Sequence, residues 1–241
     1  MTRQLALPFQ HVPDYARMAF LEAPSNADAL ALLQDNTAWP LRRLAIWGAE
    51  GSGKTHLLHR WASRHSTNVL SGASLALSPP TGPIAIDDAD LAAERPLLHM
   101  LNAASEAGFP LVLASRAAPA RWAVGLPDLA SRLRAMLAVE LRAADDALLR
   151  ALLAALFAHR QLPVAEHVQD YLLLRLPRHP AALREAAARL DRLALATGGR
   201  ITRALAARVT IEWDAGSNTT PIDENIPWPA AAGSHDTPGF F

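Results

Sequence analysis

Several residue types are absent or rare in this chain of 241 residues. It has no cysteine, which excludes disulfides and thiolate metal sites and fits a reducing, cytoplasmic location. Its 23 basic and 23 acidic side chains cancel, so no overall field draws it to nucleic acid or to an anionic membrane. The most apolar stretch, 147–158, is interrupted by Arg150 and is too short for a membrane span. We therefore predict a buried helix there, no membrane contact, and no direct, sequence-specific DNA binding.

Lysine is the rarest charged residue, because Lys54 is the only one and every other basic side chain is arginine. It lies in "GAEGSGKT", residues 48–55, which matches the phosphate-loop pattern G-x-x-x-x-G-K-[ST] between a strand-like and a helical segment. A lysine ammonium is a compact point charge, whereas the planar guanidinium of arginine is too wide for such a cradle. The segment therefore predicts a nucleotide-phosphate site (P-loop), and the alternative is a glycine-rich turn that binds nothing.

Each part of this loop has an expected task. Its backbone N–H groups should surround phosphate oxygens at the positive end of the following helix. Lys54 should reach the β and γ phosphates, and Thr55 should hold Mg²⁺. The candidate nucleotide-binding residues of this segment are Gly48, Gly51, Ser52, Gly53, Lys54, Thr55 and His56.

An acid for the metal is expected at the end of another core strand, and "PIAIDDAD" (83–90) supplies a pair. Asp87 should orient Mg²⁺ together with Thr55, and Asp88 is a candidate to polarise an attacking water. Two acids that end a strand can also cap a helix, which is the alternative interpretation.

The chain divides into regions of different character. Short apolar runs flanked by turn residues predict four buried parallel strands of an α/β sheet, at 43–48, 67–72, 83–88 and 109–115. Ahead of them, residues 25–36 have helical periodicity, with Ser25 as the expected cap. Later segments predict a small all-α domain of four helices and then a disordered tail rich in proline, glycine and polar residues. The predicted boundaries are 1–12 (N-terminal segment), 13–141 (sheet domain), 142–212 (helical domain) and 213–241 (tail).

"GKTHLLHRWA", "IAIDDAD" and above all "VGLPDLASRL" (124–133) resemble the AAA+ ATPases of the bacterial replication-initiator group, and within it the Hda-type regulatory inactivators of the initiator DnaA. The resemblance covers about residues 3 to 212. It implies a five-stranded parallel αβα nucleotide domain and a four-helix lid, with ADP or ATP and Mg²⁺ between them, and it allows a homo-oligomer. The implied partners are DnaA and the DNA polymerase III sliding clamp, which is the beta subunit.

The resemblance also assigns roles to single residues. Arg132, in the "ASRL" segment, corresponds to an arginine finger that enters the ATP site of a neighbouring subunit; the alternative is a surface arginine at a helix end. Asn26 lies where the family contacts the adenine end, and the alternative is a helix cap.

The N-terminal "QLALPF" resembles the clamp-binding peptide of the same family. The alternative is an edge strand, or a terminus packed on its own domain. The candidate clamp-binding residues are Gln4, Leu5, Leu7, Pro8 and Phe9.

Two positions depart from the family. Ala181 stands where the lid helix usually carries an arginine that faces the phosphates, with Arg178 and Arg184 nearby but out of register. Ser115 and Arg116, at sensor-like positions, stand where relatives often have a small residue followed by an acid. Both changes touch groups that sense or help cleave the γ phosphate, so we expect nucleotide binding with weak hydrolysis at best.

The favoured function is a negative regulator of replication initiation that docks on the sliding clamp and stimulates hydrolysis of DnaA-bound ATP. One alternative is a self-sufficient ATPase of the helicase-loader or transposition-loader type. Another alternative is a DnaA-like initiator that lacks its DNA-binding domain. Initiators of this group carry a basic helix-turn-helix domain after the lid, whereas residues 213–241 contain no lysine or arginine.

Overall fold

The computed structural model describes residues 20–197 and 200–217. The clamp-binding candidates, residues 4–9, and the chain from 218 onward lie outside this part. None of the helices in the described part is long and apolar enough to cross a membrane.

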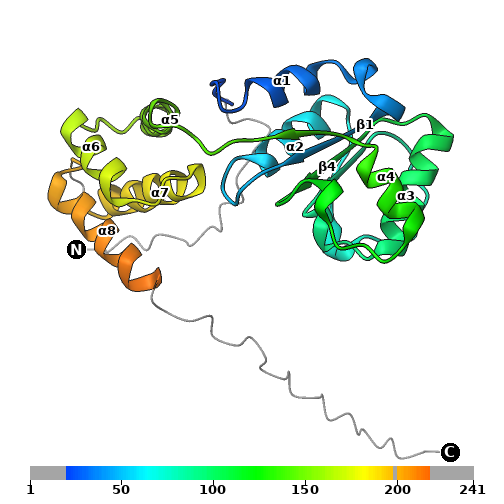
Figure 1. The fold of residues 1–241 in the computed structure, drawn as a ribbon. Coiled ribbons are helices and arrows are strands. Elements are labelled where there is room, and N and C mark those ends of the chain that lie inside the picture. Colours follow the sequence, from blue (N-terminus) through cyan, green and yellow to red (C-terminus); the bar gives the residue numbers. More distant parts are fainter. Residues whose placement is uncertain (1–19, 198–199, 218–241) are drawn as a thin grey trace, which may run out of the picture.

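A five-stranded parallel sheet organises the first domain (Figure 1), which confirms the predicted fold class. Its order, β2-β3-β4-β1-β5, sets β4 between β3 and β1, so the carboxyl ends of these three strands adjoin. Four of the strands coincide with the predicted apolar runs, and the fifth was implied by the resemblance alone. The strands are β1 (Arg43–Trp47), β2 (Val69–Ser71), β3 (Ile84–Asp87), β4 (Leu111–Ser115) and β5 (Leu137–Glu140).

Helices cover both faces of this sheet, which explains why its central strands are apolar throughout. Alternate side chains of β1 point to opposite faces: Leu44 and Ile46 pack with α1 and α2, whereas Ala45 packs with α3 and α4. The helices are α1 (Ala27–Gln34), α2 (Lys54–Arg64), α3 (Glu94–Ala107) and α4 (Pro127–Arg134). Short 3₁₀ turns are η1 (Asn36–Ala38), η2 (Pro40–Arg42), η3 (Gly72–Ser74), η4 (Ala89–Leu91) and η5 (Pro119–Arg121).

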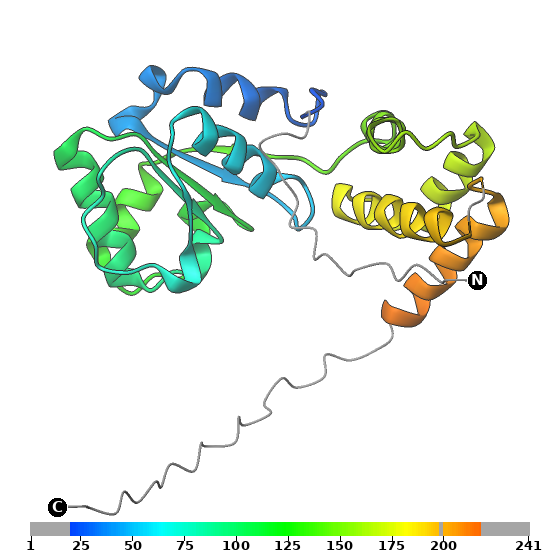
Figure 2. The same cartoon turned by 180° about the vertical axis from the view of Figure 1, so that it is seen from behind.

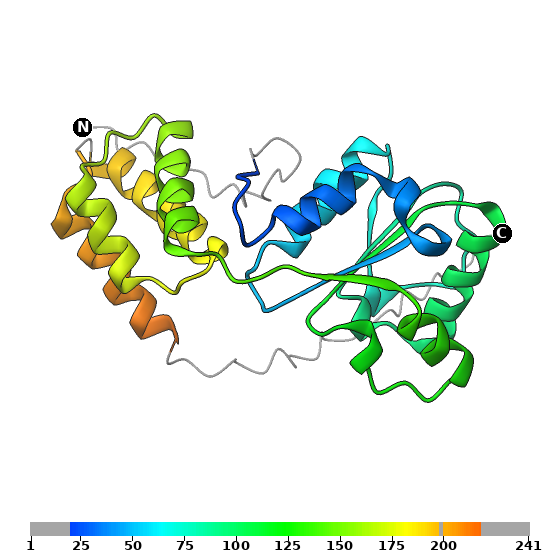
Figure 3. The ribbon, with the colours of Figure 1, turned by 45° about the horizontal axis from the view of Figure 1, so that its top comes forward.

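A second domain of four helices follows β5 (Figures 2 and 3), and we call it the lid. It has its own apolar core. All four predicted helical segments are present, and Asp145 caps the first of them by accepting a hydrogen bond from the Leu148 N–H at 2.7 Å. The predicted tail start at 213 falls inside the last helix, which runs to Ser217. The lid helices are α5 (Asp146–His159), α6 (Glu166–Arg175), α7 (Pro180–Thr197) and α8 (Arg203–Ser217).

Candidate nucleotide-binding site

The glycine-rich segment 48–53 turns sharply between β1 and α2. Gly51 and Gly53 have φ values of 74° and 105°, which side chains rarely allow, and so leave the loop backbone free to curl. Gly48 is needed for another reason, because a Cβ there would lie 2.3 Å from the Leu141 carbonyl oxygen. The Gly48 N–H donates to the Ser115 carbonyl at 3.2 Å, which ties the loop to the end of β4. The backbone is therefore the strand–loop–helix arrangement that the P-loop pattern predicts.

Lys54 begins α2 and curls back over this loop. Its Nζ donates to the carbonyl oxygens of Gly48 and Ala49, both at 2.8 Å, and the residue is only 7% exposed. Burial lowers the pKa of Lys54, while the nearby charges of Asp87 and Asp88 act in the opposite direction. Within the described chain no carboxylate forms an ion pair with this ammonium. A buried cation that is satisfied only by carbonyl groups suits a phosphate anion.

Acidic side chains gather beside the P-loop, after β3. Asp87 ends the strand, and its Oδ1 accepts a hydrogen bond from the Asp88 N–H at 3.0 Å. Asp88 has left-handed backbone angles (φ 46°, ψ 45°) and stands just before η4, but its side chain makes no capping bond. The capping interpretation of Asp88 is therefore wrong. Strained residues of this kind concentrate at functional sites, which fits the predicted role.

A third acid, Asp90, connects this group to the end of β4. Its Oδ2 accepts a hydrogen bond from the Arg116 N–H at 3.2 Å, and its buried Oδ1 has no hydrogen-bond partner in the described chain. Among residues 20–197 and 200–217, no group of three or more His, Asp or Glu side chains could hold a metal by itself. Mg²⁺ at Asp87 and Thr55 would therefore depend on phosphate oxygens to complete its shell, as is usual for this ion.

The sensor-like pair lies where the strand order requires, at the carboxyl end of β4. Ser115 is fully buried, and its Oγ donates to the Ala117 carbonyl at 2.9 Å, so the hydroxyl is used within the turn. The Arg116 side chain is exposed. The sequence placed both residues correctly next to the P-loop but could not show that the serine hydroxyl is occupied.

Asn26 shapes the segment that leads into α1. Its Oδ1 accepts a hydrogen bond from the Ala23 N–H, and its Nδ2 donates to the Leu21 carbonyl, both at 2.9 Å. Neither Asn26 nor Ser25 caps α1 through its side chain, so the expected serine cap and the alternative asparagine cap are both wrong. The predicted contact between Asn26 and adenine stays a prediction.

Three residues at this site belong to none of the sequence motifs and were not predicted as site residues. The Phe20 ring meets the buried His56 ring edge-on, with 5.1 Å between centroids, and reaches toward Gly53. From the lid, His179 lies so close to Gly51 that a Cβ on this glycine would be 2.8 Å from the histidine Cβ. Leu141, after β5, packs against Gly48 as described above. They come from distant parts of the chain, and no local pattern marks them.

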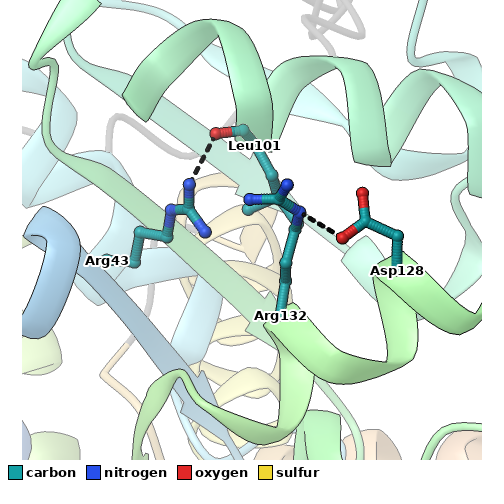
Figure 4. A network of polar contacts seen from close by, with 4 residues as sticks. All are labelled: Arg43, Leu101, Asp128 and Arg132. Carbon is teal, nitrogen blue, oxygen red and sulfur yellow. Dashed lines mark hydrogen bonds and ion pairs between the residues drawn. The ribbon is translucent and has the colours of Figure 1, made fainter. Parts of the chain in front are cut away.

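Arg132 lies near the amino end of β1, beside Arg43 (Figure 4). Its Nε donates to Asp128 Oδ1 at 3.0 Å within α4, and its guanidinium approaches that of Arg43, the first residue of β1. Arg43 is 2% exposed, its Nη2 donates to the Leu101 carbonyl at 2.8 Å, and its buried Nε has no partner in the described chain. Burial, and then the Arg132 charge, lower the pKa of Arg43.

The opposite ends of β1 thus carry the P-loop and the Arg132 cluster. The strand has five residues, which corresponds to about 13 Å between its ends at roughly 3.3 Å per residue. A guanidinium held beside the first residue of β1 therefore lies at the opposite end of this strand from the phosphate site of its own chain.

Known proteins share this architecture. No protein-family model matches the chain. An uncharacterised protein of Haemophilus influenzae is 26% identical over 223 residues, which cover 84% of this chain and 96% of that protein. Domain III of the replication initiation protein DnaA from Thermotoga maritima is similar in structure, with a TM-score of 0.70 and 19% identity over 83% of this chain and 97% of that one. AMPPCP-bound DnaA from Aquifex aeolicus has a TM-score of 0.64 and 17% identity over 81% of this chain and 68% of that one. The chain therefore has the AAA+ fold of DnaA domain III.

Proposed function

We propose that this protein binds ADP or ATP and acts in trans, docked on the sliding clamp, to stimulate hydrolysis of ATP held by DnaA. It would thereby act as a negative regulator of replication initiation. The position of Arg132 carries this proposal, because its guanidinium lies at the amino end of β1, whereas the protein's own P-loop follows the carboxyl end of this strand. An arginine in that position can contact a nucleotide phosphate only when the nucleotide is bound to a second molecule.

The protein's own nucleotide would organise the molecule. Lys54 and the loop N–H groups would hold its phosphates, with Thr55 and Asp87 around Mg²⁺. The buried, internally bonded Ser115 hydroxyl and the exposed Ala181 leave few groups to act on a γ phosphate, which supports slow turnover. The likeness to a nucleotide-analogue complex of DnaA supports nucleotide binding on the same fold.

Arg132 would stabilise the charge that develops on the γ phosphate of the partner's ATP. It now donates from Nε to Asp128, and this exposed ion pair is weak enough to be exchanged for phosphoryl oxygens. The buried charge of Arg43 next to it raises the local positive potential. The fold likeness to DnaA supports an interface of the kind in which one AAA+ domain faces another.

The decisive experiment is single-turnover hydrolysis of ATP on DnaA, with saturating protein and clamp-loaded DNA. We expect Arg132→Ala to lower the stimulated rate by about 10³-fold, the magnitude typical of arginine fingers. Arg134→Ala, which removes an exposed arginine from the same helix, is the matched control and should retain the stimulation. Near wild-type stimulation by Arg132→Ala would refute the finger role.

Clamp docking is tested separately. Alanine at Gln4, Leu5, Leu7 and Phe9 should abolish capture on immobilised clamp and leave the melting temperature unchanged, because a terminal anchor contributes to the interface and not to the core. A marked fall in the melting temperature would show instead that the segment is a structural strand.

A further inference from the structure

The lid touches the P-loop through a residue that the resemblance assigns no role. His179 precedes α7, and its ring lies directly over Gly51: a Cβ on this glycine would be 2.8 Å from the histidine Cβ, 2.9 Å from Cγ and 3.1 Å from Nδ1. Because Gly51 has no side chain and φ is 74°, the ring can approach the loop backbone itself. The loop and the start of α7 are thus in van der Waals contact.

The hydrogen bonding of His179 determines which ring nitrogen remains available. The Ala182 N–H is shared between two acceptors of His179, the carbonyl oxygen at 3.1 Å and the ring Nδ1 at 3.2 Å, so the ring helps to cap α7. An accepting Nδ1 carries no proton, so the proton of the neutral ring is on Nε2. The neutral ring therefore carries its N–H donor on Nε2, and the ring lies against the P-loop at Gly51.

Neither Arg178 nor Ala181, the residues on either side of the His179–Pro180 pair, offers a comparable donor. Arg178 forms an ion pair with Asp146, at the start of α5, and both side chains are largely exposed. Ala181, at the usual arginine position, is exposed and has no donor. His179 is thus the lid side chain that is placed against the loop.

We propose that His179 is the lid's nucleotide contact, donating from Nε2 to an α- or β-phosphate oxygen. The loop backbone around Gly51 cradles the α and β phosphates, whereas the γ phosphate is reached by the lysine. A contact at Gly51 is therefore common to ADP and ATP. It adds affinity for both nucleotides without distinguishing between them, unlike a lid arginine directed at the γ phosphate. This inference rests on the nucleotide binding proposed above.

The test is calorimetry of ADP and of AMPPCP with the full chain and His179→Ser. Serine preserves the cap of α7 but is too short to reach the loop. We expect both affinities to fall by a similar factor of about ten, as for loss of one hydrogen bond to a charged group. His167→Ser, which replaces an exposed histidine on α6, is the matched control and should bind both ligands like the wild type. An unchanged melting temperature of His179→Ser would verify the intact cap.

Two results would overturn the inference. Unchanged affinities in His179→Ser, while Lys54→Ala no longer binds, would show that the histidine only caps α7. A loss confined to AMPPCP would place the contact at the γ phosphate instead. If Lys54→Ala binds like the wild type, the proposed nucleotide site itself is wrong, so the two failures are distinguishable.

Discussion

The two ends of β1 each hold a buried cation, but their surroundings differ in sign. At the carboxyl end, burial lowers the pKa of Lys54, and the charges of Asp87, Asp88 and Asp90 reduce this shift without reversing it. At the amino end, Arg43 lies beside a second cation, Arg132, and both burial and that charge lower its pKa. The surroundings of the first end suit the proposed nucleotide phosphates and metal, whereas two like charges lie side by side at the second end.

This difference shows at which end the positive charge is surrounded by complementary groups of the same chain. The P-loop end has carbonyl acceptors, acids and a lid residue around one cation, so a bound nucleotide would be enclosed by the same molecule. At the other end, two guanidinium groups lie close together, and among the described residues Asp128 is the carboxylate that pairs with Arg132. Within the described part of the chain, no carboxylate forms an ion pair with Arg43.

The largest effect on nucleotide affinity is expected at the P-loop end. We expect Lys54→Ala to lower the affinity for ADP and ATP at least about 100-fold, because two charge-assisted hydrogen bonds to phosphate would be lost. Lys54→Arg should also fail, because the planar guanidinium does not fit the place of the compact ammonium. Isothermal titration calorimetry measures both, with Arg64→Ala at the far, exposed end of α2 as the control. Wild-type affinity in Lys54→Arg would contradict the account of why lysine is kept there.

A smaller effect is expected at the Arg43 end. Arg43→Met removes a buried charge that has no ion-pair partner in the described chain, so we expect the free energy of unfolding to stay the same or to rise by about 1 kcal/mol. Stimulated hydrolysis on DnaA should nevertheless fall, by less than with Arg132→Ala, because the local positive potential is reduced. Urea unfolding measures the stability, with Arg42→Met, its exposed neighbour, as the control. A loss of several kcal/mol would mean that Arg43 supports the fold through a pairing, and the comparison of the two ends would then fail.

The smallest effect concerns the acid that holds the finger. Asp128→Ala removes an exposed ion pair at i,i+4 spacing, which is worth about 0.3–0.5 kcal/mol. Unfolding should become easier by about that amount, and stimulation should not decrease, because the guanidinium has to leave Asp128 in order to meet phosphoryl oxygens. If Asp128→Ala reduced stimulation as much as Arg132→Ala, the acid would be a positioning residue, and the ion pair would have to persist during hydrolysis.

Sequence reasoning located the elements whose signals are local. The central strands β3, β4 and β1 and the edge strand β2 each form a short apolar run between turn residues, and the P-loop is a contiguous pattern, so these elements were predicted at nearly the observed places. The strand β5 was not found from its residues, because it lies at the edge of the sheet and alternates half-buried with exposed side chains over only four residues. The cap of α1 was predicted wrongly, because the Asn26 amide bonds to the backbone before it instead of to the helix.

The residues of the site divide in the same way. Lys54, Thr55, Asp87 and Ser115 follow from motifs at strand ends, and parallel strands bring such ends together. Phe20, His179 and Arg43 could not be predicted, because each matters through a neighbour far away in the chain. No spacing rule connects Gly51 with His179, or Arg43 with Arg132.

The sequence by itself determined the sheet, the phosphate loop and the single lysine within it, because a loop that cradles phosphate needs glycines and a compact cation in contiguous order. Only the tertiary structure decided which residues surround each cation. Packing of α4 under the sheet sets Arg132 beside the start of β1, and packing of the lid sets His179 on the P-loop. These positions depend on how separate elements meet in space, and burial and charge then act between residues that the chain keeps apart.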